Sequence, residues 1–190
     1  GYSRSSMSSA PWEELTRLDE SLLRVTRRTL GQTPAVPVAQ GLSHFGEHAL
    51  GWLALGAAGA LSDRRRRSDW LAGTVGVFAA HAAGVVVKRI VRRPRPTLPD
   101  VPALVGTPSR LSFPSAHSCS TAAAAVGFGP LIGRAPMGGI TGVMLVSRVL
   151  LGVHYPSDVV SGAVLGAGTA AAVRHWSARR RPVDVLQGRP

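Results

Sequence analysis

Cysteine and aromatic residues are scarce in this sequence, and each shortage limits what can be concluded about the protein. Cys119 is the only cysteine, so the chain forms no internal disulfide and its redox compartment cannot be inferred. Aromatic residues make up 5% of the chain, and neither a zinc-finger nor an RNP-type pattern occurs. The excess of positive charge, +12, therefore does not indicate a nucleic-acid partner. Arginine at the edges of a membrane and around an anion explains this excess better.

The length of 190 residues corresponds to one domain. Residues 1–10 are expected to be disordered or a remnant of expression, and the N-terminal region has no apolar stretch typical of a cleavable signal peptide. Residues 11–178 are expected to form the folded domain, and residues 179–190 a basic tail.

Residues 11–30 have the pattern of an amphipathic helix. Pro11 suits the first helical position, and acidic residues follow in the first turn. Apolar side chains recur every three or four residues and form one stripe, made of Trp12, Leu15, Leu18, Leu22 and Val25. Arginines crowd the other faces, so this helix is too charged to span a bilayer and should lie on the membrane surface or cap the rest of the fold. Residues 31–37 are expected to end it.

Five apolar segments follow, at residues 41–61, 70–91, 116–133, 136–152 and 158–176. A membrane-spanning helix needs about 20 apolar residues, and several of these segments are near the lower limit. Glycines four residues apart favour close helix packing in a membrane, and they occur in the pairs Gly138/Gly142 and Gly162/Gly166. A soluble helical protein would have little polar surface left to face water. The sequence therefore predicts an all-α polytopic membrane helical bundle, with about five transmembrane helices and an N-terminal amphipathic interfacial helix.

The connections between the apolar segments alternate between two sides of the membrane. With five spans, one side carries the polar segments Lys88–Arg95, Ser115–His117 and Arg148–Asp158, and the other side carries Arg64–Arg67, Arg134 and Arg179–Arg181. The connection at residues 92–114 contains six prolines and no periodicity. A long irregular segment in this position is expected to be a lid or a loop that lines a functional site.

The polar segments of the first side supply groups that suit phosphate chemistry. Lys88, Arg95 and Arg148 can bind the nonbridging oxygens of a phosphate group. Ser115 suits the N-cap of the next helix, where its Oγ and the N–H of Ala116 would join the phosphate cradle. Two histidines and one carboxylate complete the set, which fits phosphoryl transfer without a metal.

These segments resemble the three motifs of the phosphatidic acid phosphatase type 2 family, K-x6-R-P, P-S-G-H and S-R-x5-H-x3-D. The corresponding segments here are Lys88–Pro96, Pro114–His117 and Ser147–Asp158. The resemblance extends into the apolar segments around them. Ala116 stands where the family usually has glycine. Alanine keeps the backbone N–H, but it adds a methyl group and restricts φ.

The resemblance implies roles for the two histidines. His154 would be the nucleophile and form a phosphohistidine, while His117 would protonate the leaving alkoxide and later activate water. Asp158 follows His154 by four residues, so its carboxylate can accept a hydrogen bond from one ring nitrogen and leave the other free to attack. A mechanism of this kind requires no metal and no cofactor.

The family resemblance also implies a lipid-phosphate substrate and a bilayer environment. The short chain and its GC-rich bacterial amino-acid usage favour a polyprenyl-linked cell-wall precursor. Decaprenylphosphoryl-5-phosphoribose is the first choice, with undecaprenyl diphosphate or phosphatidylglycerol phosphate as alternatives. Two other classes are a vanadate-dependent haloperoxidase, which would be larger and soluble, and a non-enzymatic membrane scaffold. Nothing in the sequence indicates an oligomeric state.

We expect an integral protein of a bacterial plasma membrane with its site on the extracytoplasmic face. Basic residues occur on both sides of the predicted bundle, but Lys88, Arg95 and Arg148 have catalytic reasons to be where they are.

Several charged residues lie outside these assignments. Residues His44–His48 read H-x-x-E-H, the inverzincin zinc signature, but no glutamate follows Glu47 to complete the ligand set. We therefore expect no zinc; the cluster would contact the substrate headgroup, or His44 would pair with Glu47. His81 is expected to form a helix-to-helix hydrogen bond. Arginines expected to extend to the membrane interface are Arg89, Arg92 and Arg93.

Overall fold

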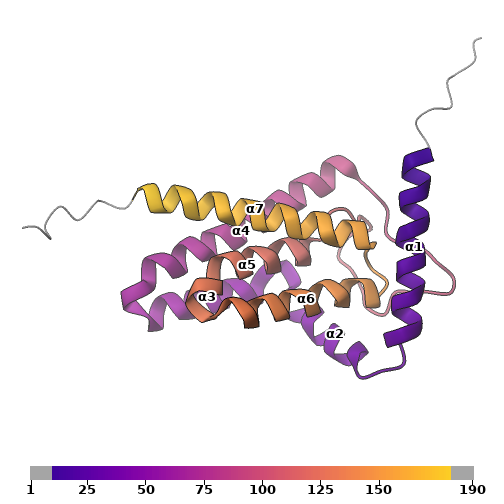
Figure 1. Cartoon of the computed structure of the whole chain (residues 1–190), viewed down its shortest axis with the longest axis horizontal. Coiled ribbons are helices and arrows are strands. Elements are labelled where there is room, and N and C mark those ends of the chain that lie inside the picture. The colour runs from indigo at the N-terminus through magenta and orange to yellow at the C-terminus, as the bar shows by residue number, and fades with distance from the viewer. Residues whose placement is uncertain (1–9, 181–190) are drawn as a thin grey trace, which may run out of the picture.

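The structure of the chain is a computed structural model that describes residues 10–180. These residues form seven α-helices and two single turns of 3-10 helix. The helices are α1 (Ala10–Leu30), α2 (Ala35–Phe45), α3 (Leu50–Ser62), α4 (Arg67–Val91), α5 (Ala116–Ile132), α6 (Arg134–Leu150) and α7 (Pro156–Arg179). Helices α3 to α7 form a bundle, and α1 lies across one end of it (Figure 1). The all-α prediction is confirmed.

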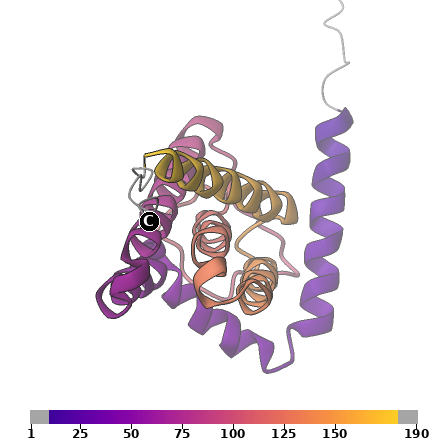
Figure 2. The same ribbon diagram turned by 60° about the vertical axis from the view of Figure 1, so that its left-hand side comes forward.

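Helix α5 lies at the centre of the bundle, against α4, α6 and α7 (Figure 2). Its Phe128 is fully buried and contacts Trp70 of α4, with ring centroids 5.4 Å apart. Glycines let the helices approach closely, since a Cβ on Gly166 of α7 would overlap the backbone of Cys119 in α5. Gly162 faces α5 in the same way. The predicted packing role of this glycine pair is confirmed.

The second glycine pair has a different environment. Within residues 10–180, a Cβ on Gly138 or Gly142 would meet no atom within 4 Å, because both residues lie on the outer face of α6. The close helix packing that this spacing favours is therefore not found for this pair within the described residues. Gly142 instead lines an apolar groove of about 620 Å³ between α2 and α6, which we name the α2–α6 groove.

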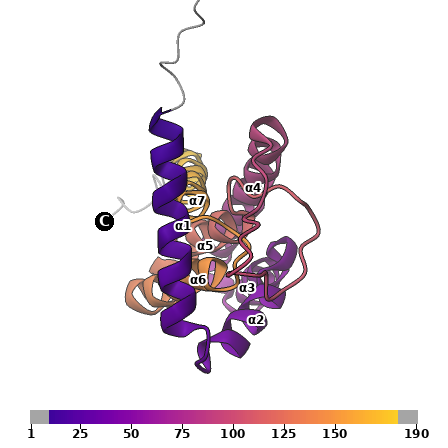
Figure 3. The same ribbon diagram turned by 90° about the vertical axis from the view of Figure 1, so that its right-hand side faces the viewer.

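Helix α1 is the predicted amphipathic helix, and it crosses the end of the bundle against α6 and α7 (Figure 3). Asp19 and Leu23 on its inner face are buried. Leu18, Leu22 and Val25, which belong to the predicted apolar stripe, are more than half exposed. These three side chains therefore point away from the bundle.

The apolar segment predicted at 41–61 is not one continuous helix. Helix α2 already begins at Ala35, in the region expected to be a loop, and α3 begins only at Leu50. A single 3-10 turn between them holds His48 and Ala49 at φ values of 50° and 61°, in the left-handed region. The break occurs at the polar segment His44–His48, and the left-handed backbone angles that produce it are not evident from composition.

The lengths of the helices support only part of the predicted membrane topology. Arg64–Val91 is the one helical stretch within residues 10–180 that is long and apolar enough to cross a membrane by length and composition. Helices α3, α5 and α6 are shorter, with 13, 17 and 17 residues. A third of the apolar stretch on α4 is buried within the bundle, while Phe78, Val86 and Ile90 of this helix are exposed. By this criterion, one membrane-spanning helix is identified where about five were predicted.

The three motifs meet at the end of the bundle that α1 crosses (Figure 1). Helices α4 and α6 end there, and α5 and α7 begin there. The proline-rich connection folds over this end through backbone hydrogen bonds from Ser112 to Arg93 and from Leu104 to Leu151. The predicted convergence of the motifs is therefore confirmed.

Candidate active site

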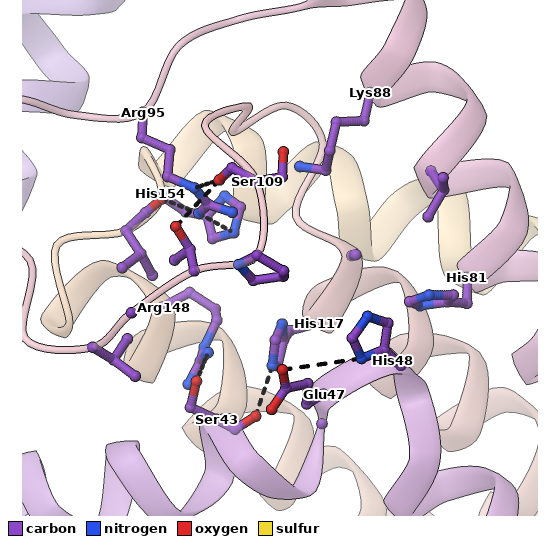
Figure 4. A pocket seen from close by; sticks show the side chains of 18 of the residues that line it. Ser43, Glu47, His48, His81, Lys88, Arg95, Ser109, His117, Arg148 and His154 are labelled. Atoms are coloured by element: carbon purple, nitrogen blue, oxygen red, sulfur yellow. Dashed lines mark hydrogen bonds and ion pairs between the residues drawn. The ribbon is translucent and has the colours of Figure 1, made fainter.

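A cavity of about 370 Å³ opens at the motif end of the bundle (Figure 4). Six of the predicted site residues line it, namely Lys88, Arg95, Ala116, His117, Arg148 and His154. The other two, Ser115 and Asp158, are fully buried behind its wall. The proline-rich loop lines it too, with residues 105–109, so its predicted position beside the site is confirmed.

His154 lies in the short turn before α7, which Tyr155 caps and Pro156 begins. The ring is 3% exposed, and its Nε2 lies 3.1 Å from a guanidinium nitrogen of Arg95. Because a guanidinium can only donate, Nε2 is the acceptor in this contact and holds a lone pair. Burial is the main cause that lowers the pKa of His154 to about 4. The ring is therefore neutral near pH 7, with its unprotonated nitrogen facing the cavity.

Asp158 lies beside the other nitrogen of the same ring. Its Oδ2 is 3.7 Å from Nδ1 of His154, which is longer than a hydrogen bond. The carboxylate instead accepts hydrogen bonds of 2.9 Å from the backbone N–H of Tyr155 and from Arg93. Nδ1 of His154 is buried and has no partner among residues 10–180. The predicted hydrogen bond is thus not formed here, although the negative charge still favours a proton on Nδ1.

Arg93 does not extend to a membrane interface, so that prediction is wrong. Its guanidinium donates to Asp158 at 2.9 Å, to Ser157 at 2.7 Å and to Asp19 of α1 at 2.8 Å. It also stacks on the ring of Tyr155, 4.0 Å from the centroid. No local pattern could reveal this role, because the partners come from helices far apart in the sequence.

Lys88 and Arg95 are held at the cavity wall by backbone carbonyls. The Lys88 ammonium donates to the carbonyls of residues 111 and 112 at 3.1 and 2.9 Å. The Arg95 guanidinium donates to the carbonyls of Ser109 and Val153 at 2.8 and 2.6 Å. Burial lowers the pKa of Arg95 to about 10, so it remains charged at neutral pH. Both cations are therefore oriented before any anion binds.

Arg148 and His117 share a partner that the sequence did not reveal, Ser43 of α2. Arg148 is 1% exposed and donates to the Oγ of Ser43 at 2.9 Å and to the carbonyl of Ala39 at 3.1 Å. The Nε2 of His117 lies 3.0 Å from the carbonyl of Ser43. A carbonyl can only accept, so this nitrogen carries the proton and Nδ1 is left free.

Ser115 and Ala116 begin α5. Ser115 is its N-cap, as predicted, and its Oγ accepts a 3.4 Å hydrogen bond from the backbone of Ser118. This contact turns the hydroxyl toward its own helix, and Ser115 is not among the residues that line the cavity; its contact with phosphate stays a prediction. Ala116 does line the cavity. It is absent from the residues of positive φ in the described part of the chain, so the position does not require the glycine that the motif usually has.

The H-x-x-E-H segment lines the far side of the cavity but is not one helical turn. Glu47 lies 4.0 Å from the ring of His48, so the predicted pairing of His44 with Glu47 is not found. Across residues 10–180, no three His, Cys, Asp or Glu side chains are arranged to hold a metal ion. His81 makes no helix-to-helix hydrogen bond through its buried Nδ1, contrary to expectation, and its ring lies 6.4 Å from that of His48.

Comparison with known proteins agrees with this arrangement. The chain is 51% identical over 156 residues to decaprenylphosphoryl-5-phosphoribose phosphatase of Mycolicibacterium smegmatis, covering 82% of this chain and 84% of that protein. It is 53% identical over 135 residues to the protein of the same name from Mycobacterium tuberculosis, covering 71% of this chain and 76% of that one.

A solved structure and a family model extend the comparison. The fold matches that of a transmembrane PAP2 type phosphatidylglycerolphosphate phosphatase from Bacillus subtilis, with a TM-score of 0.74 and 24% identity, over 90% of this chain and 89% of the other. The two chains thus share a fold. Residues 69–182 match the model of the PAP2 superfamily. The chain is therefore a phosphatase of the PAP2 superfamily, as its three motifs predicted.

Proposed function

We propose that the chain removes the phosphate from a polyprenyl-linked phosphoribose, with decaprenylphosphoryl-5-phosphoribose as its substrate. The relatives that bear this name share more than half of their aligned residues with the chain. The observation that carries the proposal is the contact of 3.1 Å between Nε2 of His154 and Arg95 inside the cavity. It puts an unprotonated nitrogen beside a cation that can bind phosphate, and Lys88 and Arg148 line the same cavity.

In the first chemical step, Nε2 of His154 attacks phosphorus. A nitrogen–phosphorus bond forms, the bond from phosphorus to the sugar oxygen breaks, and the phosphoryl group stays on His154. Lys88, Arg95 and Arg148 exchange their hydrogen bonds to protein oxygens for bonds to the phosphoryl oxygens and offset the charge there. His117 enters this step as an imidazolium, with its second proton on Nδ1 beside the anionic phosphate. It gives that proton to the departing oxygen, so the sugar leaves as an alcohol and His117 becomes neutral.

In the second step, water attacks the phosphohistidine and His117 accepts a proton from it. The nitrogen–phosphorus bond breaks, inorganic phosphate leaves, and His154 returns to its neutral form. Substrate, water and two histidines account for every bond and proton in this cycle.

Asp158 orients the nucleophile and stabilises the positive ring that forms when His154 is phosphorylated. It is fully buried, and the N–H of Tyr155 and the guanidinium of Arg93 fix its carboxylate. With the carboxylate on the Nδ1 side of the ring, the proton is favoured there and Nε2 stays free for attack.

We further propose that helices α3 to α7 are embedded in the bacterial plasma membrane, with α1 at its surface and the cavity open to the extracytoplasmic side. The exposed apolar side chains on α4 support the embedding of the bundle, because a soluble protein rarely leaves Phe78, Val86 and Ile90 together in water. The exposed stripe of α1, at the same end as the cavity, supports contact with the interface.

The polyprenyl chain of the substrate would lie in the α2–α6 groove. Exposed valines Val38, Val143 and Val146 line this groove. It adjoins the phosphate site, since the groove residues Ala39 and Ser147 both accept hydrogen bonds from Arg148. Burying the chain contributes about 0.8 kcal/mol per CH₂ group, so a lipid-linked substrate should bind much better than its soluble headgroup.

Phosphate release from a panel of lipids in detergent tests the function. The panel is decaprenylphosphoryl-5-phosphoribose, undecaprenyl diphosphate, phosphatidylglycerol phosphate and phosphatidic acid, with ribose 5-phosphate as the lipid-free control. We expect kcat/KM on the first lipid to exceed the others by about tenfold or more. A higher value on another lipid would reassign the substrate. No release from any of them would favour a membrane scaffold.

A further inference from the structure

Glu47 is the one carboxylate among the described residues that line the cavity, and it is poorly matched to an anion site. Its side chain is 49% exposed, and the ion pair found for it is with the ring of His48 at 4.0 Å. Arginines and a lysine line the same cavity, yet within residues 10–180 none of them forms an ion pair with Glu47. A free carboxylate opposes phosphate binding through like-charge repulsion, so it needs a different partner on the ligand.

Two histidines beside Glu47 can also form further hydrogen bonds. The rings of His48 and His81 lie 6.4 Å apart, and both line the cavity. Nδ1 of His81 is buried and has no partner in the part of the chain that the structure describes. Buried polar atoms are rarely left unpaired, so an unpaired nitrogen on a cavity wall indicates a polar ligand.

This group lies next to the catalytic acid. Gly46 precedes Glu47, and a Cβ on Gly46 would come within 2.6 Å of the His117 ring, so the chain passes directly against it. Figure 4 shows Glu47 and His48 on the side of His117 away from Arg95 and His154. If phosphate binds at His154 and Arg95 and displaces their 3.1 Å contact, the sugar carrying it would extend past His117 toward Glu47.

The backbone there is held in a costly conformation. His48 and Ala49 are consecutive residues with φ values of 50° and 61°, and neither is glycine. Left-handed backbone in such residues costs roughly 1–3 kcal/mol each and persists where surrounding structure enforces it, often at ligand sites. The surrounding structure therefore enforces the turn that presents Glu47 and His48 to the cavity.

We propose that Glu47, His48 and His81 form a subsite that binds the neighbouring hydroxyl groups of the substrate's sugar. A carboxylate has two oxygens that can each accept from one hydroxyl of a vicinal diol, and neutral imidazoles can donate or accept at the same hydroxyls. The site would thereby distinguish a sugar phosphate from a lipid phosphate that lacks hydroxyls. The inference rests on the proposed function, because it presumes a ribosyl headgroup.

Kinetics with three lipids test this subsite. They are decaprenylphosphoryl-5-phosphoribose, its 2-deoxyribose analogue and phosphatidic acid, each given to the wild type, Glu47→Ala and His81→Phe. We expect the wild type to prefer the ribose lipid to the deoxy analogue by about tenfold or more, since a site built for a hydroxyl rejects its absence. Glu47→Ala should erase that preference and lose at least about tenfold more kcat/KM on the ribose lipid than on phosphatidic acid. His81→Phe, which keeps an aromatic ring, should reduce the preference in the same direction.

Glu14→Ala is the matched control, because Glu14 is an exposed glutamate on α1 outside the cavity. It should keep the wild-type preference. A Glu47→Ala protein with an unchanged melting temperature and an unchanged ribose preference overturns the subsite alone. Equal losses on all three lipids overturn it as well, since they indicate a structural role. A wild type that prefers phosphatidic acid overturns the proposed function and the subsite together.

Discussion

Arg93 donates a 2.9 Å hydrogen bond to the fully buried carboxylate of Asp158. The same guanidinium contacts Asp19 at 2.8 Å, so the arginine connects α1 to the group that orients the nucleophile. Removing one partner of a buried charge pair leaves the other without compensation, which is strongly destabilising.

Arg93→Ala should therefore reduce kcat with little change in KM, because Arg93 does not line the cavity in the described structure. We expect kcat to fall by about 10–100-fold, which is comparable to the effect of removing a residue that orients a metal ligand through a hydrogen bond. Steady-state kinetics measure the loss of kcat, and thermal unfolding measures the loss of stability. Arg92→Asn is the control, since it removes an exposed charge and asparagine tolerates the φ of 56° at that position. Equal losses in both variants would contradict a specific role for Arg93.

Phosphoenzyme trapping separates the roles of the two histidines. His154→Ala should form no phosphoenzyme and release no phosphate, because no other side chain replaces the attacking nitrogen. His117→Ala should lose about 10²–10⁴ in rate and accumulate phosphoenzyme when a good leaving group removes the need for an acid. Acid-quenched incorporation of labelled phosphate from an aryl phosphate measures this. Labelled protein in His154→Ala would assign the nucleophile elsewhere.

The depressed pKa of His154 predicts that stability falls in acid. The unfolded ring takes up a proton below about pH 6.5, whereas burial keeps the folded ring neutral down to about pH 4. Protons therefore favour the unfolded chain in this window, and the stabilisation present above pH 6.5 is lost toward pH 4. Melting temperatures in detergent should show a shallower acid decline in His154→Asn. His175→Asn, at an exposed position of α7, should keep the wild-type slope. If the melting temperature declined equally with pH in the wild type, His154→Asn and His175→Asn, protonation of His154 would not be the cause of the acid decline.

The position of Gly46 predicts a steric effect on catalysis. A Cβ there would lie 2.6 Å from Cδ2 of His117 and 3.3 Å from Cε of Met144, so Gly46→Ala must displace the imidazole. We expect kcat to fall by about tenfold or more as the acid loses its alignment. Gly41→Ala is the matched control on α2, since a Cβ at Gly41 meets no described atom within 4 Å. Normal turnover in Gly46→Ala would show that the histidine tolerates the shift.

The proposed orientation predicts which cysteines are accessible from outside the cell. In a Cys119→Ser background, Thr107→Cys lies in the loop beside the cavity, and Ser62→Cys lies at the opposite end of α3. Both positions are exposed. An impermeant thiol reagent on intact cells should label the first and spare the second. The reverse pattern would assign the cavity to the cytoplasmic side.

The features that the sequence predicted well depend on local patterns. The spacing of Leu18, Leu22 and Val25 predicts α1 and its exposed face, because helical periodicity is a local property. The convergence of His117 and His154 follows from counting helices that cross the bundle, so it needs no knowledge of side-chain packing.

The features that it missed depend on contacts between distant segments. Ser43 of α2 contacts His117 and Arg148 only because α2 packs beside α5 and α6. Arg93 contacts Asp19 only because α1 lies beside the start of α7. The break before Leu50 is set by the backbone angles of His48 and Ala49, residues that ordinarily continue a helix. Charge alone therefore led to the wrong interpretation of Arg93 as an interfacial residue.

In the proposed membrane position, the contacts from Asp19 through Arg93 to Asp158 would also fix a distance perpendicular to the bilayer. Asp19 belongs to the helix that we expect to float at the headgroup layer, and Asp158 belongs to the rigid start of α7. Because hydrogen bonds of 2.8 and 2.9 Å join them through Arg93, the reactive nitrogen of His154 would stay at a constant height above the hydrocarbon in the proposed membrane position. An enzyme held in this way would select substrates by how far their phosphate protrudes from the membrane, a criterion of length that acts in addition to headgroup chemistry.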